Sequence, residues 1–285
     1  MLYDPGETTS FRASDGNMVK IEYYKELPST SDLAKNYAEA GKPDRYVVFA
    51  EKQFCSSITG SKESFASFES GIFMSIILRP SFFPSQAGLL APLAATALLG
   101  AFEEHTTKTA GIGWVSSIIH NGKKIGGVTI EGKLNDFSSY EYMIVSFGLR
   151  LDKNVFSPRL TDLIRKVFDD ENPSVSMLVA RTVLNKFFTV YIDIKNPAKH
   201  MDHYKQKFCY YGKKVKYFSN GKKHSGRITE VDKTNCTLTI VGSDGKSFKV
   251  TSPSSIIIPQ KNSLFDYLNR SFGSKKEKKT AQKIT

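Results

Sequence analysis

Short apolar runs separated by turn residues dominate the first part of the chain and predict strands with one helix among them. The strands are expected at 19–24, 46–51 and 72–78, because aliphatic and aromatic side chains fill these runs. A helix is expected at 29–40, where a hydroxyl side chain can cap the first turn and apolar residues recur at helical spacing along one face.

The longest apolar stretch, residues 87–102, predicts a buried helix. Its sixteen residues would span ~24 Å as a helix, which is short of the ~30 Å hydrocarbon core of a bilayer. Pro92 stands near the expected start, and the acidic residues Glu103 and Glu104 follow the end. We therefore expect no membrane span.

Beyond residue 110 the pattern predicts a second set of strands followed by helices. Asn121 and Gly122 form a typical hairpin turn between two apolar runs. The expected elements are strands at 111–119, 125–131 and 142–151 and helices at 157–168, 175–188 and 197–208. Strands and helices in this order predict an α/β (α+β) domain with a mixed sheet backed by helices.

From residue 212 to residue 258 the pattern changes to short apolar runs with glycine turns between them. This spacing predicts a small antiparallel β-barrel. The predicted organisation is a flexible N-terminus at 1–18, a large domain at 19–208, a small C-terminal β-barrel domain at 209–260 and a basic, disordered tail at 261–285.

The net charge of +12 comes partly from the lysine-rich tail and partly from a basic cluster in the predicted barrel. The basic cluster consists of Lys213, Lys214, Lys216, Lys222, Lys223 and Arg227. Such an excess favours an acidic partner, which leaves nucleic acid, an anionic surface or an acidic carrier domain open. A solvated lysine-rich face is the alternative.

The three cysteines have no metal-ligand spacing and are expected to be reduced thiols. The first residues lack the apolar block behind a basic start that is typical of a signal peptide. The chain is therefore expected to be intracellular, in the cytoplasm or in an organellar matrix. No metal site is predicted, because the group formed by His200, Asp202 and His203 offers no fourth ligand.

The segment 123–127 combines two lysines with two glycines at the start of a predicted strand. Gly126 and Gly127 allow a backbone or a ligand to come close where a Cβ would intrude. On spacing alone, a hairpin with a solvated lysine is the simpler interpretation.

This segment belongs to a series of motifs that resembles the biotin protein ligases, within the wider biotin/lipoate ligase fold. In chain order the motifs are Glu-Leu-Pro-Ser-Thr-Ser-Asp at 26–32, Phe-Ala-Glu-Lys-Gln at 49–53, the run at 67–78, Gly-Trp at 113–114, Lys-Lys-Ile-Gly-Gly at 123–127 and Phe-Gly-Leu-Arg at 147–150. The resemblance runs from about Lys20 to Pro259. It implies the fold of that family, including a C-terminal barrel of the SH3-like type.

The family activates biotin with ATP to biotinyl-adenylate and then transfers biotin to a lysine of a carrier domain. The resemblance therefore implies biotin and ATP with Mg²⁺ as ligands if the chain is active, and a biotin carboxyl carrier-type acidic domain as the partner. It implies that Lys124 is the catalytic cation, at the biotin carboxylate. Other residues that it implies for ligand binding are Ser29, Thr30, Gln53, Trp114, Gly126 and Gly127. Several of these can also serve the fold, whereas packing does not require a lysine at position 124.

Two motifs that face phosphate or metal in the family depart from its pattern. The loop 54–65 lacks the arginines that the family has there, and lysine does not replace their bidentate contacts. Gly113 stands in place of a lysine, and Ser116 and Ser117 stand in place of an Asn-Asp pair. Hydroxyls do not hold Mg²⁺ as a carboxylate does.

The closing strand departs as well, with Ser146 in place of a glycine and Arg150 in place of an asparagine. The three departures together predict a degenerate member of the family, a pseudo-ligase or structural subunit with weak or no ATP-dependent biotin transfer. Such a protein would act through partners in a protein complex. An active, divergent biotin–[carboxyl carrier protein] ligase is the alternative. An RNA- or ribonucleoprotein-associated scaffold that uses the basic barrel and tail is the second alternative, and lipoate or octanoate in place of biotin also stays open.

Overall fold

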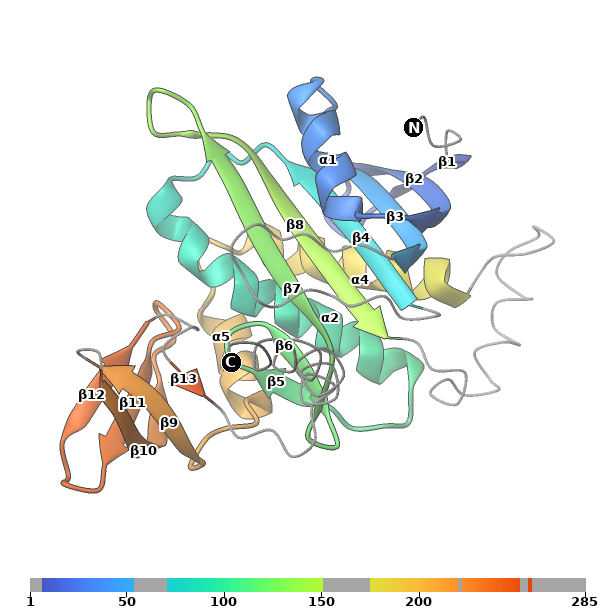
Figure 1. Cartoon of the computed structure of the whole chain (residues 1–285). Helices are drawn as coiled ribbons and strands as arrows, with labels where there is room; N and C mark the ends of the chain where they lie inside the picture. The colour runs from blue at the N-terminus through green and yellow to red at the C-terminus, as the bar shows by residue number, and fades with distance from the viewer. Residues whose placement is uncertain (1–6, 54–70, 151–174, 220–221, 252–255, 258–285) are drawn as a thin grey trace, which may run out of the picture.

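The computed structural model describes residues 7–53, 71–150, 175–219, 222–251 and 256–257, which form two β-sheets and their flanking helices (Figure 1). The larger sheet consists of β1 (Glu7–Arg12), β2 (Met18–Leu27), β3 (Tyr46–Gln53), β4 (Gly71–Leu78), β5 (Gly111–Gly113), β6 (Ser117–His120), β7 (Lys123–Leu134) and β8 (Tyr140–Arg150). The helices are α1 (Thr30–Glu39), the 3-10 helix η1 (Pro84–Leu89), α2 (Leu90–His105), α4 (Val175–Ile192) and α5 (Ala198–Lys207). The smaller sheet consists of β9 (Lys214–Ser219), β10 (Lys222–Val231), β11 (Leu238–Gly242), β12 (Ser247–Val250) and β13 (Ile256–Ile257).

The larger sheet is mixed, as predicted. Its strand order is β1-β2-β3-β4-β8-β7-β6-β5, and β2 and β3 are parallel, whereas the other neighbours described are antiparallel. Helix α1 packs on one face, against β3, β4 and β8, and α2 and α4 cover the other face (Figure 1). Every residue of β4 is buried because helices lie on both of its faces.

Helix α1 begins where the sequence predicts because Ser29 caps it. The Ser29 Oγ accepts a hydrogen bond from the backbone N–H of Asp32 at 3.1 Å. The side chains on the buried face are all small, so the helix can lie close to the sheet. They are Thr30, Ser31, Ala34 and Ala38.

The apolar stretch predicted as a buried helix forms α2, which is shifted toward the C-terminus because η1 occupies the preceding residues. By length and composition alone, the helical segments Gln86–His105 and Val175–Ile192 could cross a membrane. Core helices of globular proteins pass the same test, and both segments pack here against the larger sheet.

Two details of the larger sheet differ from the sequence prediction. Residues 7–12, predicted to be flexible, form β1 and pair antiparallel with β2, so a backbone ladder orders a segment with polar side chains. The predicted strand 111–119 is divided, because a turn at 114–116 folds β6 back onto β5. The turn at Asn121 and Gly122 is confirmed, with φ angles of 50° and 73° that suit a type I′ hairpin.

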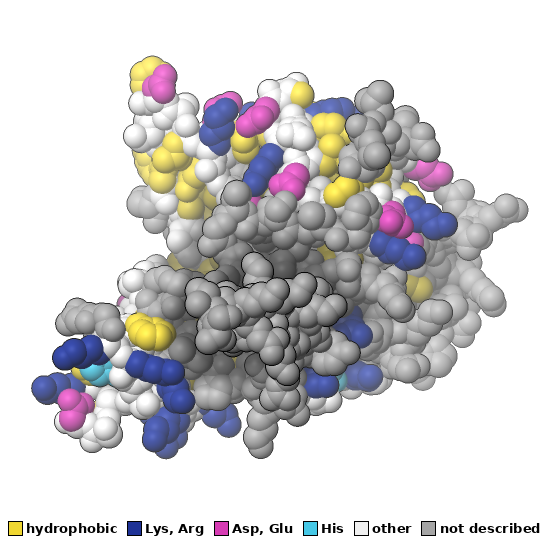
Figure 2. Space-filling view, in the orientation of Figure 1, with side chains coloured by type: hydrophobic (Ala, Val, Ile, Leu, Met, Phe, Trp, Pro, Cys, Tyr) yellow, Lys and Arg dark blue, Asp and Glu magenta, His cyan; other side chains and the backbone are white. Residues whose placement is uncertain are grey.

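The predicted helix 157–168, the loop 54–65 and the basic tail lie outside the described residues. The smaller sheet has the order β12-β11-β10-β9-β13, and all of its pairs are antiparallel. Within the described residues this sheet is open, with β12 and β13 at its edges, so the SH3-like barrel is not confirmed. The whole basic cluster is exposed, and Lys and Arg side chains gather over this sheet in Figure 2.

A continuous core joins the two sheets. Side chains of both sheets belong to one hydrophobic cluster. The indole Nε1–H of Trp114 donates to the carbonyl of Cys236 at 2.9 Å, and the Tyr204 hydroxyl donates to the carbonyl of Val115 at 2.8 Å. Side chains on both sides of the predicted division between residues 208 and 209 thus pack together.

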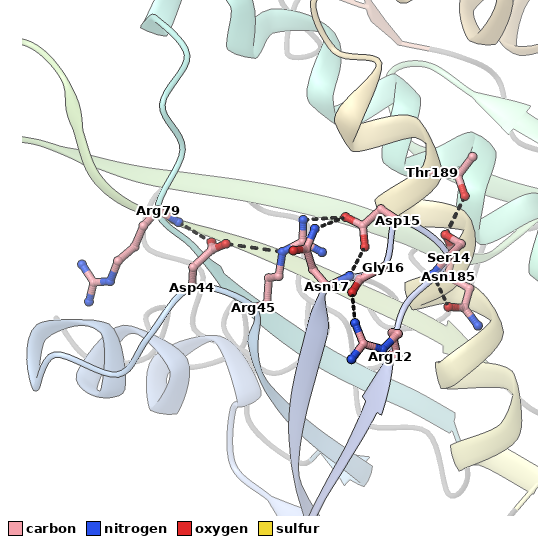
Figure 3. Close-up of polar contacts among 10 residues, drawn as sticks. All are labelled: Arg12, Ser14, Asp15, Gly16, Asn17, Asp44, Arg45, Arg79, Asn185 and Thr189. Carbon is pink, nitrogen blue, oxygen red and sulfur yellow. Dashed lines mark hydrogen bonds and ion pairs between the residues drawn. The ribbon is translucent and has the colours of Figure 1, made fainter.

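A buried ion pair fixes the β1–β2 loop to the start of β3 (Figure 3). The Arg45 guanidinium contacts the Asp15 carboxylate at 2.6 Å and lies 4.2 Å from the ring centre of Phe188 on α4. The Asp15 side chain is only 2% exposed. Ser14 adds a hydrogen bond from its hydroxyl to the backbone carbonyl of Asn185, also on α4, at 2.8 Å. The loop that follows β1 is thus attached to the larger sheet and to α4.

A second buried carboxylate, Glu22 of β2, accepts hydrogen bonds from three tyrosine hydroxyls. Tyr24 donates at 2.6 Å, Tyr37 of α1 donates at 3.0 Å, and Tyr46 of β3 donates as well. Burial alone would raise the pKa of Glu22, but the three donors outweigh it and hold the pKa below its usual value. The arrangement joins α1 to the edge of the sheet.

We expect Glu22→Gln to lower the free energy of unfolding at pH 7 by about 1–2 kcal/mol, because charge-assisted hydrogen bonds become neutral ones. The stability that Glu22 contributes is present above the pKa of the unfolded carboxyl and is lost as the pH falls through the lower, folded pKa. Urea unfolding at pH 7 and pH 3 measures both effects. The difference between the two pH values should be smaller for Glu22→Gln than for the wild type, and an equal difference would contradict this account.

Candidate functional site

A row of buried polar side chains crosses the sheet at the start of α1. Ser146 of β8 and Ser75 of β4 are register partners, and their hydroxyl oxygens lie 2.9 Å apart. Ser75 Oγ lies 3.0 Å from Thr30 Oγ1, which in turn lies 3.2 Å from Gln53 Oε1 on β3. These four residues, which we call the hydroxyl relay, are each no more than 7% exposed. Their polar atoms satisfy one another in an otherwise apolar environment.

The direction of every hydrogen bond in the hydroxyl relay follows from one backbone group. The Thr30 N–H can only donate, and it donates to Gln53 Oε1 at 2.9 Å, which fixes the orientation of the Gln53 carboxamide. The Thr30 hydroxyl must then donate to the same carbonyl oxygen. Its proton is thereby used, so Ser75 must donate to Thr30, and Ser146 must donate to Ser75. The relay therefore runs one way, from Ser146 to Gln53.

The relay leaves the first turn of α1 with groups suited to a polar ligand. Because the Gln53 carbonyl oxygen faces Thr30, its amide NH₂ points away from the relay as a donor. The Ser31 Oγ is buried and has no hydrogen-bond partner among the described residues. A helix N-terminus also carries partial positive charge. A ligand group with a carbonyl or carboxylate oxygen fits these donors.

Lys124 lies on the same sheet, farther along β7. A β-bulge lies between Lys124 and Gly126. Gly126 pairs with Ile118 of β6, whereas Lys124, two residues earlier on β7, pairs with the next residue of β6, Ile119. The Lys124 Cε comes within 3.6 Å of the position that a Cβ would take at Gly127. The lysine stem therefore lies over Gly127, in the direction of the relay along β7.

The relay and Lys124 are not in contact. Thr129 is the register partner of Ser146, and it lies five positions along β7 from Lys124, which is roughly 16 Å at ~3.3 Å per residue. Gly127 and its partner Gly148 lie between them. The arrangement fits an elongated acid with a polar head at the relay and a carboxylate near Lys124.

Three of the predicted ligand-binding residues have structural contacts in the described part of the chain. A Cβ at Gly126 would lie 2.5 Å from the carbonyl oxygen of Gly148, so glycine is needed for β7 to approach β8. Trp114 is 8% exposed and donates to Cys236, as described above. Ser29 caps α1 and positions Thr30 and Ser31.

The positions that resemble the family's metal-facing motif do not fit a metal ion. Ser116 donates its hydroxyl proton to the Val128 carbonyl at 2.7 Å, and a Cβ at Gly113 would already lie 3.1 Å from side-chain atoms of Ile119 and Tyr210. Among the described residues, no three His, Cys, Asp or Glu side chains form a group that could hold a metal.

Sequence reasoning did not assign Ser75 or Ser31 to the site. Ser75 lies within an apolar strand run, where a small hydroxyl residue gives no periodic signal. Its relevance comes from register, which places it beside Ser146 and under Thr30. The signal that could have identified Ser75 is its polar side chain at the centre of a strand that is buried on both faces.

The mixed sheet with this site at α1 has the fold of the biotin protein ligases. Among solved structures, the chain is similar to the biotin protein ligase from Aquifex aeolicus in complex with biotin and ATP, with a TM-score of 0.62, 19% identity, and coverage of 85% of this chain and 99% of that one. A biotin protein ligase-like protein of unknown function from Silicibacter sp. gives a TM-score of 0.54 at 13% identity, over 82% of this chain and 94% of that one. At these identities the likeness shows the fold.

Curated proteins point the same way. The chain is 29% identical over 143 residues to the bifunctional ligase/repressor BirA of Bacillus subtilis (strain 168), which is 50% of this chain and 44% of the relative. The protein of the same name from Bacillus spizizenii is 28% identical over 131 residues, or 46% of this chain and 40% of the relative. The chain thus spans less than half the length of these relatives. No protein-family model matches it. Its relatives in sequence and its neighbours in structure are biotin protein ligases, which confirms the resemblance of the motifs.

Proposed function

We propose that the chain binds biotin at the first turn of α1 and carries out weak or no ATP-dependent transfer. The observation that carries the proposal is the hydroxyl relay, which presents the Gln53 amide donors beside the unpartnered, buried Ser31 hydroxyl. A buried polar group without a hydrogen-bond partner destabilises the folded protein, and a ligand that supplies the partner removes this cost. A cyclic urea supplies the carbonyl oxygen that these donors require.

The length of the site supports biotin as the occupant. Biotin is an elongated acid with a polar ring at one end and a carboxylate at the other. The relay and the Lys124 side chain provide donors and a cation at the two ends of a glycine-floored stretch of β7 and β8. Lipoate and octanoate share the carboxylate but lack the urea, so they use one end of the site only.

The proposal of weak or no transfer rests on groups that the chain lacks or uses elsewhere. The Ser116 hydroxyl is engaged with a backbone carbonyl, and Gly113 carries no side chain. The loop 54–65 has no arginine in its sequence. Transfer of an adenylate needs cations placed at developing negative charge, and lysine does not replace the bidentate contacts of arginine. An active, divergent ligase in which Lys124 suffices is the competing function.

Partners and cellular location are proposed on the same basis. If transfer survives, the partner is an acidic carrier-type domain, since the exposed basic cluster complements one; otherwise the chain acts within a protein complex. We propose that the smaller sheet is part of an SH3-like barrel. The cysteines that the structure describes, Cys209 and Cys236, are free thiols, which suits an intracellular compartment.

Calorimetric titration tests the proposed function. We expect biotin to bind, and we expect ATP with Mg²⁺ neither to bind nor to strengthen the binding of biotin. Thr30→Val interrupts the hydroxyl relay and should weaken biotin binding about tenfold, the effect of roughly one lost hydrogen bond. Thr229→Val on β10 is the matched control, because Thr229 is exposed and far from α1 in the chain's fold.

Three results would contradict the proposal. If titration with biotin produces no heat, the proposed biotin site is wrong. Thr30→Val with wild-type affinity removes the role of the relay. Biotin transferred to a carrier domain in the presence of ATP, and lost in Lys124→Ala, establishes the active ligase instead.

A further inference from the structure

Ser146 is the start of the hydroxyl relay, and it stands where the family pattern has glycine. Its hydroxyl lies 2.9 Å from Ser75 Oγ, and its side chain is 7% exposed. A glycine at this position could still pair β8 with β4 and β7 through the backbone. The hydroxyl is therefore an addition to the strand that the sheet itself does not require.

The addition changes what the relay can do. Without Ser146, the Ser75 hydroxyl would donate to Thr30 but accept no hydrogen bond among the described residues. With Ser146, the Ser75 and Thr30 hydroxyls each accept one hydrogen bond and donate another. A hydroxyl that accepts a hydrogen bond becomes a stronger donor, so the polarisation accumulates from Ser146 to the carbonyl oxygen of Gln53.

We propose that Ser146 is a positioning residue that strengthens the hold on the Gln53 carboxamide, whose orientation the Thr30 N–H sets, and that it thereby raises the affinity of the site for acids whose head group carries a carbonyl oxygen. The inference rests on the proposed biotin site and adds to it a residue that the family pattern does not have. Ser146 acts through Ser75 and Thr30.

The first test needs no ligand. The side-chain amide of Gln53 gives a pair of proton signals on one nitrogen in an NMR spectrum of labelled protein. We expect Ser146→Ala to shift this pair and to speed its solvent exchange, because the carbonyl oxygen of the amide is held less firmly. Ser146→Thr keeps a hydroxyl and should retain the wild-type signals. Ser225→Ala on β10 is the matched control, since Ser225 is exposed and belongs to the smaller sheet.

The second test is selectivity between two probes, biotin and octanoate. We expect Ser146→Ala to weaken biotin binding about three- to tenfold and to leave octanoate binding unchanged, whereas Ser146→Thr restores biotin affinity to within about twofold of the wild type. A general structural role would instead weaken both acids equally.

The outcomes separate this inference from the proposed function. Equal loss of both acids in Ser146→Ala, or no loss of either, overturns the role of Ser146 while biotin binding by the wild type stands. If the wild type binds neither acid, the proposed function is wrong. The role of Ser146 in holding Gln53 is then decided by the amide signals of Gln53 alone. Signals that do not move in Ser146→Ala then overturn the inference, and signals that move only in that variant support it.

Discussion

Replacing Arg45 with alanine is expected to lower the free energy of unfolding by about 3–5 kcal/mol, because it leaves the Asp15 carboxylate buried without its cation. The guanidinium also stacks on Phe188, so its removal loses contact with α4. Burial would raise the pKa of Asp15, but the hydrogen bond and charge of Arg45, with the donors of Asn17, hold that pKa below its usual value. Urea unfolding of the two proteins at pH 7 measures the difference.

A surface ion pair supplies the control for Arg45→Ala. Lys133 and Glu141 pair at 3.2 Å between β7 and β8, but both side chains are more than 40% exposed. Lys133→Ala should therefore cost less than about 1 kcal/mol. A double-mutant cycle with Asp15→Asn isolates the interaction of Arg45 with Asp15. A loss below about 1 kcal/mol for Arg45→Ala would contradict the structural importance of the buried pair.

Gly126→Ala is expected to destabilise the protein by about 3 kcal/mol and to remove biotin binding. The new Cβ would lie 2.5 Å from the backbone carbonyl oxygen of Gly148, and backbone cannot move aside as a side chain can. Relief of the clash would separate β7 from β8 next to Gly127. Thermal unfolding and calorimetric titration of the same sample measure both consequences.

The same substitution at Gly132, on the same strand, provides a matched control. There the Cβ would lie 2.7 Å from the ring of Tyr140, a side chain that can rotate away. Gly132→Ala should change the free energy of unfolding by less than about 0.5 kcal/mol, since alanine also restricts the unfolded chain. Equal losses of stability in both variants would show that β7 does not need glycine at position 126 to approach β8.

Local patterns in the sequence were sufficient for most elements of the larger sheet. The start of α1 follows from Ser29 as a capping residue, and the hairpin at Asn121 and Gly122 follows from residues that tolerate positive φ. The buried α2 follows from its unbroken apolar composition. These features depend on neighbours in the chain, so one sequence is enough to predict them.

The parts that the sequence did not predict depend on contacts between distant residues. β1 is held by the ladder with β2, although its side chains are mostly polar. The hydroxyl relay takes one residue each from β8, β4, α1 and β3, and only the register of the strands brings them together. Of the predicted site residues, Thr30 and Gln53 meet in the relay, and Lys124 and Gly127 meet on β7. Trp114 instead contacts the smaller sheet.

That contact has a mechanical consequence. Trp114 lies in the turn between β5 and β6, and β6 pairs with β7 at the bulge beside Lys124. Its indole is hydrogen-bonded to the backbone of Cys236, next to β11. A displacement of the smaller sheet would therefore bear on the turn between β5 and β6 and, through the pairing of β6 with β7, on the strand that carries Lys124.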